Sequence, residues 1–148
     1  QDYIRCAGSL GWGLSGAIGV KCALPNRPVI CFSGDGGFMY HIAELETAVR
    51  YNIPVVSVVN NNHGLLQDKR GDDRAYQAVP GSHSSDLWEF NDVDMSKVAE
   101  AMGAFGIRVD QPQDIQNAIE EALASGRPAV VDVVTDPLDS EAPIPWSP

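Results

Sequence analysis

The sequence lacks a surplus of positive charge: 10 Lys and Arg stand against 20 Asp and Glu, a formal net charge of −10 at pH 7. Proteins that bind nucleic acid usually present a basic surface to the phosphates. The charge balance therefore predicts a protein that has no nucleic-acid partner.

Long hydrophobic runs and cysteines are also scarce. No apolar run approaches the ~20 residues that a membrane-spanning helix needs, so we expect no membrane partner. The three cysteines, Cys6, Cys22 and Cys31, are odd in number and show no metal-ligand spacing. They predict reduced, partly buried thiols in a cytoplasmic protein.

What is present is the composition of an ordinary folded domain. Of the 148 residues, 44% are hydrophobic and 20% are charged. A chain of this length can bury its own hydrophobic core, which predicts one domain.

Residues 34–62 carry the clearest pattern in the chain. An apolar run at 29–32 leads into the glycine-rich segment 33–37. A helical spacing of apolar residues follows, and residues 55–59 form a second, β-branched run that ends in three asparagines. The helical spacing is that of Ile42, Leu45, Ala48 and Val49. This pattern predicts a strand–loop–helix–strand unit, whose two strand exits would share one edge of a parallel sheet.

The residues at these exits indicate what the edge could bind. Gly36 and Gly37 would bring backbone N–H groups to a helix N-terminus, which suits phosphate. Asp35 and Asn62 offer the oxygen ligands that Mg²⁺ takes together with phosphates. The set predicts a metal-bridged diphosphate, whereas an ordinary turn with a capping Asp would explain residues 34–36 alone.

The motif Gly34-Asp35-Gly36 is followed by the pair Asn61-Asn62, with Asn62 27 positions after Asp35. This arrangement resembles that of thiamine diphosphate (ThDP) enzymes. The approach AGSLGWGLSGAIGVKCALPNRPVICFSGDGGF is similar to that of the acetolactate synthase and benzoylformate decarboxylase type. The resemblance covers residues 6–137. It implies the C-terminal diphosphate-binding domain, a three-layer α/β fold with a central, mostly parallel sheet. Its first strand and helix would be lacking. We expect this domain over residues 1–137 and an extended proline-rich tail over 138–148.

The resemblance also implies the ligands of the cofactor. Asp35, Asn62 and the Gly64 carbonyl would hold Mg²⁺. The Gly8 carbonyl would accept from the aminopyrimidine, and Leu10 would support the bent shape of ThDP. The implied cofactor-binding residues are Gly8, Leu10, Gly34, Asp35, Gly36, Gly37, Asn62, Gly64, Leu65 and Leu66.

The implied activity is decarboxylation of a 2-oxo acid, followed by release of an aldehyde or transfer to a second carbonyl. No catalytic residue is expected in this chain, because the activating Glu of the family lies on a pyrimidine-binding domain. We therefore expect a chain that is inactive alone, in a homodimer or homotetramer, with FAD binding left open. The alternatives are a non-catalytic module that keeps the fold and a subunit of another ThDP enzyme class.

Plain α/β patterns surround the motif. Glycine-punctuated residues 8–24 predict a helix. Residues 64–94 form the least regular segment, which Trp88 and Phe90 are expected to pack down. Further along, Ser96 is a candidate helix cap. The remaining predicted elements are a strand at 106–109, a helix from Pro112 to Gly126, and a strand at 128–135.

Overall fold

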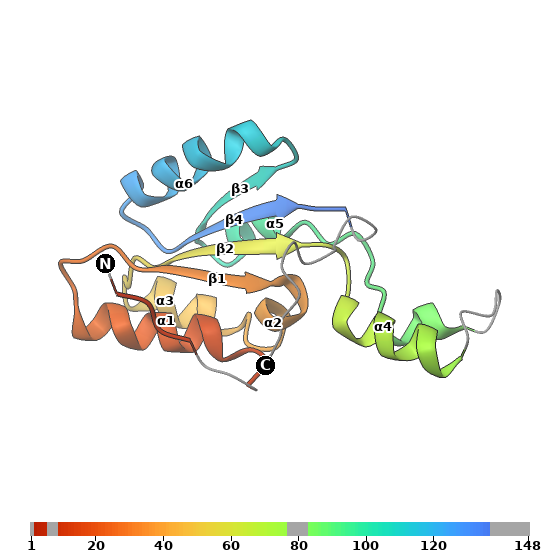
Figure 1. Ribbon diagram of the computed structural model, residues 1–148. Helices are drawn as coiled ribbons and strands as arrows, with labels where there is room; N and C mark the ends of the chain where they lie inside the picture. Colours follow the sequence, from red (N-terminus) through yellow and green to blue (C-terminus); the bar gives the residue numbers. More distant parts are fainter. Residues whose placement is uncertain (1, 6–8, 77–82, 137–148) are drawn as a thin grey trace.

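The computed structural model describes residues 2–5, 9–76 and 83–136 and shows an α/β domain built on one sheet (Figure 1). The strands lie in the order β1-β2-β4-β3, and every neighbouring pair is parallel. They span β1 (Ile30–Gly34), β2 (Val56–Asn61), β3 (Phe105–Val109) and β4 (Ala129–Val134). The predicted fold class is confirmed.

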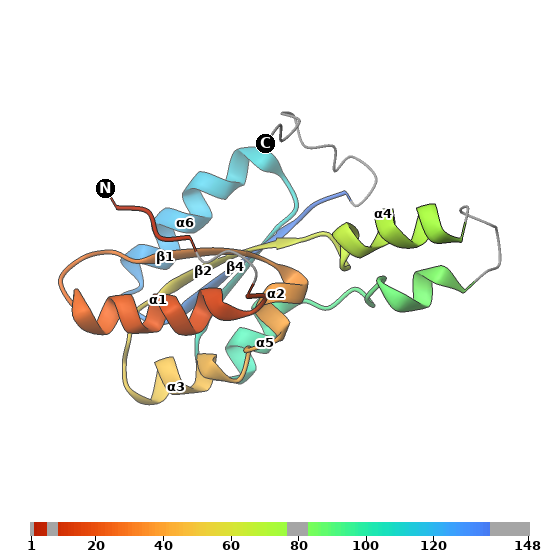
Figure 2. The same ribbon diagram turned by 60° about the horizontal axis from the view of Figure 1, so that its bottom comes forward.

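Helices cover both faces of this sheet and complete the three layers (Figures 1 and 2). On one face lies α6 (Ile115–Ala124), which follows the short 3-10 helix η2 (Pro112–Asp114). On the opposite face lie α1 (Trp12–Ala23), α2 (Asp35–Met39), α3 (Glu44–Arg50) and α5 (Met95–Ala101). None of the helices in the described ranges is long and apolar enough to cross a membrane.

Side chains alternate along β2 and so contribute to two cores. Val55 and Val59 pack into the core that α1, α2, α3 and α5 cover, whereas Val56 and Val58 pack under α6. A parallel strand that is buried on both faces needs apolar residues at consecutive positions. This requirement explains the continuous β-branched run in the sequence.

The predicted strand–loop–helix–strand unit contains two helices in the structure, where the spacing of residues 42–49 predicted one. Helix α2 begins at Asp35, directly after β1, and a turn separates it from α3. Phe38 of α2 and Leu45 of α3 are both buried in the same core cluster, and the turn between them lets both reach it. The glycine-rich segment is thus the start of a helix.

The cap predicted at Ser96 is wrong, because helix α5 begins one residue earlier, at Met95. Its N-cap is Asp94, whose Oδ1 accepts a hydrogen bond from Lys97 N at 3.0 Å. The Ser96 hydroxyl lies inside the helix and donates to the same oxygen at 2.5 Å. Both residues are good caps. The hydrogen bond from Met95 N to Asp132 Oδ2 at 3.0 Å holds the start of the helix at Met95.

The irregular segment after β2 forms an arm that extends beyond the carboxyl ends of the strands (Figures 1 and 2). It contains α4 (Leu66–Ala75) and the 3-10 helix η1 (Ser84–Leu87). At its base, Leu65 N donates to Trp88 O at 2.7 Å and Phe90 N donates to His63 O at 2.7 Å. The backbones of Trp88 and Phe90 thus join the two ends of the arm, and the packing role of their side chains stays a prediction.

Candidate metal and cofactor site

Asp35 connects the two loops that follow β1 and β2. Its side chain is buried, with 2% of the residue exposed. Oδ1 accepts from Gly36 N at 2.8 Å, and Oδ2 accepts from Gly64 N at 2.9 Å. One carboxylate thus joins the first turn of α2 to the loop after β2, and it brings two of the predicted metal ligands into direct contact.

The environment of Asp35 also affects its charge. Burial raises the pKa of the carboxyl group, while hydrogen bonds from Gly36 and Gly64 and the nearby His63 oppose that rise. A divalent cation beside the carboxylate would favour its charged form. Burial thus disfavours the charged carboxylate, and a neighbouring positive group would be needed to offset that cost.

Asn62, two residues before Gly64, has a buried side-chain oxygen. This Oδ1 accepts no hydrogen bond in the structure. Buried polar atoms are nearly always paired, so an unpaired one needs an explanation. An amide oxygen, a carboxylate and a backbone carbonyl are oxygen ligands of the kind that Mg²⁺ binds, so the residues present fit the metal.

A different kind of metal site does not occur in the described part of the chain. No group of three or more His, Cys, Asp or Glu side chains there is arranged to hold a metal ion. A metal at this edge would therefore depend on the amide of Asn62 and the carbonyl of Gly64 beside Asp35.

The glycines of α2 allow a close approach of two neighbouring segments. A methyl group on Gly36 would lie 2.5 Å from Leu65 Cδ2, and one on Gly37 would lie 3.4 Å from Leu10 Cδ1. The structure thus gathers Leu10, Leu65 and both glycines around the first turn of α2. The Gly36 N–H already donates to Asp35, whereas Gly37 lies in the first helical turn, where N–H groups have no α-helical partner.

A groove of about 540 Å³ runs along α1 and β1 and reaches this cluster. Leu10, Gly34 and Gly37 line it at the end of β1. Its volume lies in the range of small-molecule sites, ~300–1,000 Å³. Of the other predicted cofactor residues, Leu66 directly follows Leu65 and is the first residue of α4. Gly8 lies outside the described residues.

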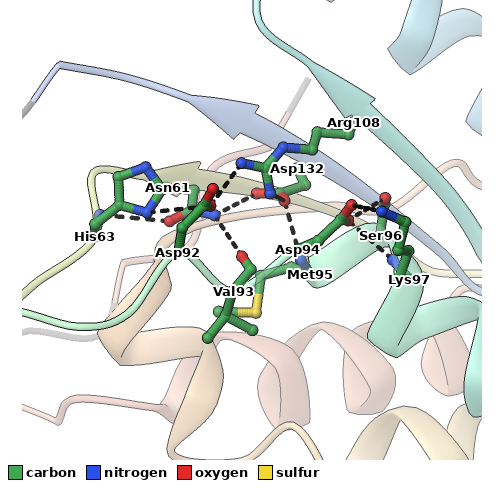
Figure 3. Close-up of polar contacts among 10 residues, drawn as sticks. All are labelled: Asn61, His63, Asp92, Val93, Asp94, Met95, Ser96, Lys97, Arg108 and Asp132. Atoms are coloured by element: carbon green, nitrogen blue, oxygen red, sulfur yellow. Dashed lines mark hydrogen bonds and ion pairs between the residues drawn. The ribbon is translucent and has the colours of Figure 1, made fainter.

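Sequence reasoning missed a buried polar network on the same side of the sheet (Figure 3). Its centre is Asp132 on β4, which is fully buried. This carboxylate accepts from Asn61 Nδ2 at 2.9 Å, from Met95 N at 3.0 Å and from Arg108 Nη1 at 3.2 Å. Burial raises the pKa of Asp132, and the hydrogen bond from Asn61 opposes that rise. A lone Asp in the apolar run AVVDVV was the available signal.

His63 lies between this network and Asp35. Its backbone φ is 59°, in the left-handed region that non-glycine residues seldom adopt. Its Nδ1 is 3.7 Å from Asp92 Oδ1, and Arg108 Nη2 donates to the same oxygen at 2.7 Å. The chain after β2 therefore makes a sharp turn beside the Asp35 site.

These features define an α/β domain with a candidate ligand site at the carboxyl edge of a parallel sheet. Residues 1–133 match the family described as "Thiamine pyrophosphate enzyme, C-terminal TPP binding domain". The chain belongs to this family, which confirms the resemblance found in the sequence.

Individual relatives carry the names of a lyase and of a synthase. A 2-hydroxyacyl-CoA lyase of Arabidopsis thaliana is 38% identical over 134 residues, which cover 88% of this chain and 23% of that protein. The acetolactate synthase isozyme 3 large subunit of Escherichia coli (strain K12) is 38% identical over 132 residues, 87% of this chain and 22% of that protein. The chain thus spans under a quarter of the length of these relatives.

A solved structure has the same fold. It is the thiamine diphosphate-dependent 4-hydroxybenzoylformate decarboxylase of Rhodococcus jostii RHA1, which is 33% identical to this chain with a TM-score of 0.71. The match covers 86% of this chain and 23% of that one. The similarity therefore extends over nearly all of this chain and one part of the larger enzyme.

Proposed function

We propose that this domain anchors the diphosphate of ThDP through Mg²⁺, as part of a 2-oxo acid decarboxylase or carboligase. The observation that carries the proposal is the joined pair of loops after β1 and β2. There the Asp35 carboxylate holds Gly64 N at 2.9 Å, and the buried Asn62 oxygen has no hydrogen-bond partner. Family membership supports the identity of the cofactor.

The chain's own residues would each contribute one interaction. Asp35, Asn62 and the Gly64 carbonyl would hold the metal, and N–H groups at the start of α2 would bind phosphate. Leu10 would contact the cofactor from the groove side. Bound ThDP would supply the chemistry that decarboxylates a 2-oxo acid.

The activating glutamate would come from a pyrimidine-binding domain. In this chain Glu44 and Glu46 lie in the first turn of α3, and Glu46 forms an ion pair with Arg50 at 3.0 Å. Neither carboxylate is among the residues that surround Asp35. We propose that residues 1–137 work with such a domain in a homodimer or homotetramer and are inactive without it.

The cellular location and the substrates are further parts of the proposal, and they concern the whole protein. Cys22 and Cys31 are free thiols, and burial raises the pKa of Cys31. Free thiols support a cytoplasmic location. The 2-oxo acid, the acceptor and FAD binding depend on segments beyond the cofactor site described above.

Calorimetric titration of the complete protein with ThDP and Mg²⁺ tests the proposal. We expect the unaltered protein to bind and Asp35→Ala to weaken binding by on the order of 100-fold or more, because removing a direct ligand should exceed the 10–100-fold cost of losing a supporting residue. Asp110→Ala is the matched control, since Asp110 is exposed at the end of β3 on the same edge of the sheet.

The outcomes separate the alternatives. If the unaltered protein does not bind ThDP with Mg²⁺, the anchoring function is wrong. If it binds the cofactor but releases no carbon dioxide from any 2-oxo acid, a non-catalytic module that has kept the site is the better description.

A further inference from the structure

Asp132 joins three separate elements close to the loop that follows β2 (Figure 3). Its Oδ1 accepts from Asn61 at the end of β2. Its Oδ2 accepts from the first backbone N–H of α5, at Met95, and from Arg108 on β3. Because Arg108 also donates to Asp92, the carboxylate is fixed in position by groups from β2, β3 and α5.

This carboxylate determines which way the Asn61 amide faces. The Asn61 Nδ2 group donates to Asp132 Oδ1 at 2.9 Å and to Val93 O at 3.1 Å. An amide NH₂ has two donors, so both are used. Asn61 is buried, with 1% of the residue exposed. Its Oδ1 must therefore point away from Asp132.

The fixed Oδ1 in turn stabilises the bend after β2. It accepts from His63 N at 3.4 Å, which closes a turn in which an Asn side chain bonds the backbone two residues on. This bond supports the left-handed backbone of His63, at φ 59°. The turn encloses Asn62 and delivers Gly64 N to Asp35.

We propose that Asp132 is a positioning residue for the metal site: through Asn61 it fixes the turn that presents Asn62 and Gly64 to the cation. This inference rests on the proposed anchoring of Mg²⁺ and adds to it a residue on β4 that contacts none of the metal ligands. Such supporting residues typically change metal affinity by 10–100-fold when they are replaced.

The substitution Asp132→Asn tests the direction of the Asn61 amide. The new side chain would have one oxygen for three donors. Arg108 and Met95 N would retain that oxygen, because two donors, one of them charged, outweigh one. The new NH₂ would then face Asn61 Nδ2. Asn61 can remove this clash only by rotating its amide, which places a donor against His63 N and opens the turn.

Calorimetric titration of Mg²⁺ into the complete protein with saturating ThDP measures the effect. We expect Asp132→Asn to raise the apparent Kd for Mg²⁺ at least tenfold. Asp110→Asn is the matched control, because it removes one carboxylate charge from an exposed residue at the same edge of the sheet, and it should change the Kd less than about twofold. Urea unfolding of the metal-free proteins shows separately how much stability each variant loses.

A double-mutant cycle tests whether Asp132 acts through Asn61. Asn61→Ala leaves Asp132 with its Met95 and Arg108 donors, so it also carries the test if Asp132→Asn fails to fold. We expect Asn61→Ala to weaken Mg²⁺ binding as Asp132→Asn does. In the Asn61→Ala protein, adding Asp132→Asn should raise the Kd for Mg²⁺ less than about twofold further, because Asp132 can no longer act through Asn61.

Three results would overturn the inference. Asp132→Asn could lower stability and leave the Kd for Mg²⁺ unchanged, which would make Asp132 a purely structural residue. Asn61→Ala could bind Mg²⁺ as tightly as the unaltered protein. The increases in Kd for Mg²⁺ caused by the two changes could also multiply in full in the double variant, which would show that Asp132 does not act through Asn61. By contrast, no binding of Mg²⁺ and ThDP to the unaltered protein would overturn the proposed function and the inference with it.

Discussion

Gly64 is the residue at which the absence of a side chain matters most for the site. A methyl group there would lie 2.5 Å from the carbonyl oxygen of Trp88 and 3.2 Å from its ring. A backbone oxygen cannot move aside as the end of a flexible side chain can. The bridge between Gly64 and Glu89 at the base of the arm therefore requires glycine.

We expect Gly64→Ala to separate the arm from the loop that follows β2. The Gly64 N–H would move away from Asp35, which predicts a loss of Mg²⁺–ThDP binding. The overpacking should also cost about 1–3 kcal/mol of unfolding free energy. Calorimetric titration and urea unfolding measure the two effects.

Gly71→Ala is the control for this substitution. Gly71 lies on α4 with nothing within 4 Å of an added methyl group, so the change should stabilise the helix by up to about 1 kcal/mol. Equal affinity for Mg²⁺–ThDP in Gly64→Ala and Gly71→Ala would contradict the role assigned to Gly64.

Helix α5 shows how a single element depends on its cap. Desolvation of the Asp94 carboxylate acts against its charge, but hydrogen bonds from Ser96 and Lys97 lower its pKa from 3.8 to about 2. Because the pKa is depressed in the folded state, the contribution of Asp94 is present above pH 3.8. It is lost as the pH falls from 3.8 towards 2.

We expect Asp94→Ala to cost about 1 kcal/mol of unfolding free energy at pH 7, which is typical of a lost N-cap. The difference from the unaltered protein should shrink at pH 3 and disappear only below pH 2, where Asp94 is protonated in the folded state as well. Urea unfolding at several pH values measures it.

Asp114→Ala is the matched control for the cap. Asp114 occupies the N-cap position of α6 but makes no capping hydrogen bond there. Its replacement should cost less than about 0.5 kcal/mol. A cost for Asp94→Ala that stays constant between pH 7 and pH 3 would show that the carboxylate charge does not stabilise α5.

At the scale of the whole molecule, the parallel sheet separates the site from the far face. The loops that carry the proposed metal ligands follow β1 and β2 and belong to the side that carries α2 and α5, whereas α6 covers the other core. A ligand at the carboxyl edge should therefore restrain the two sides to different extents (Figure 2).

Hydrogen exchange before and after removal of Mg²⁺ with EDTA tests this expectation. At a Mg²⁺–ThDP concentration of 100 Kd, linkage predicts about 100-fold slower opening of segments that must release the ligand. We expect this protection at residues 34–37 and 61–66 and no comparable change in α6. An equal change in both faces of the sheet, or none at 34–37, would contradict the placement of the site.

Local sequence patterns determined the elements and the edge at which the site lies. The β-branched run of β2 must be buried on both faces, and Gly126 ends α6 in the left-handed conformation, with φ 64°. The motif of Asp35 and Asn62 pointed to one edge because parallel strands end on the same side. These signals act over a few residues, so the sequence carries them directly.

Only the tertiary structure decided how the asparagines after β2 divide their work. Asn61 turns inward to Asp132, 71 positions away, whereas the neighbouring Asn62 keeps an unpaired buried oxygen. The resemblance assigned Asn62 to the metal, but no local pattern assigned Asn61 to Asp132. The choice depends on which face of β2 lies over Asp132, and the pairing of β2 with β4 sets that register.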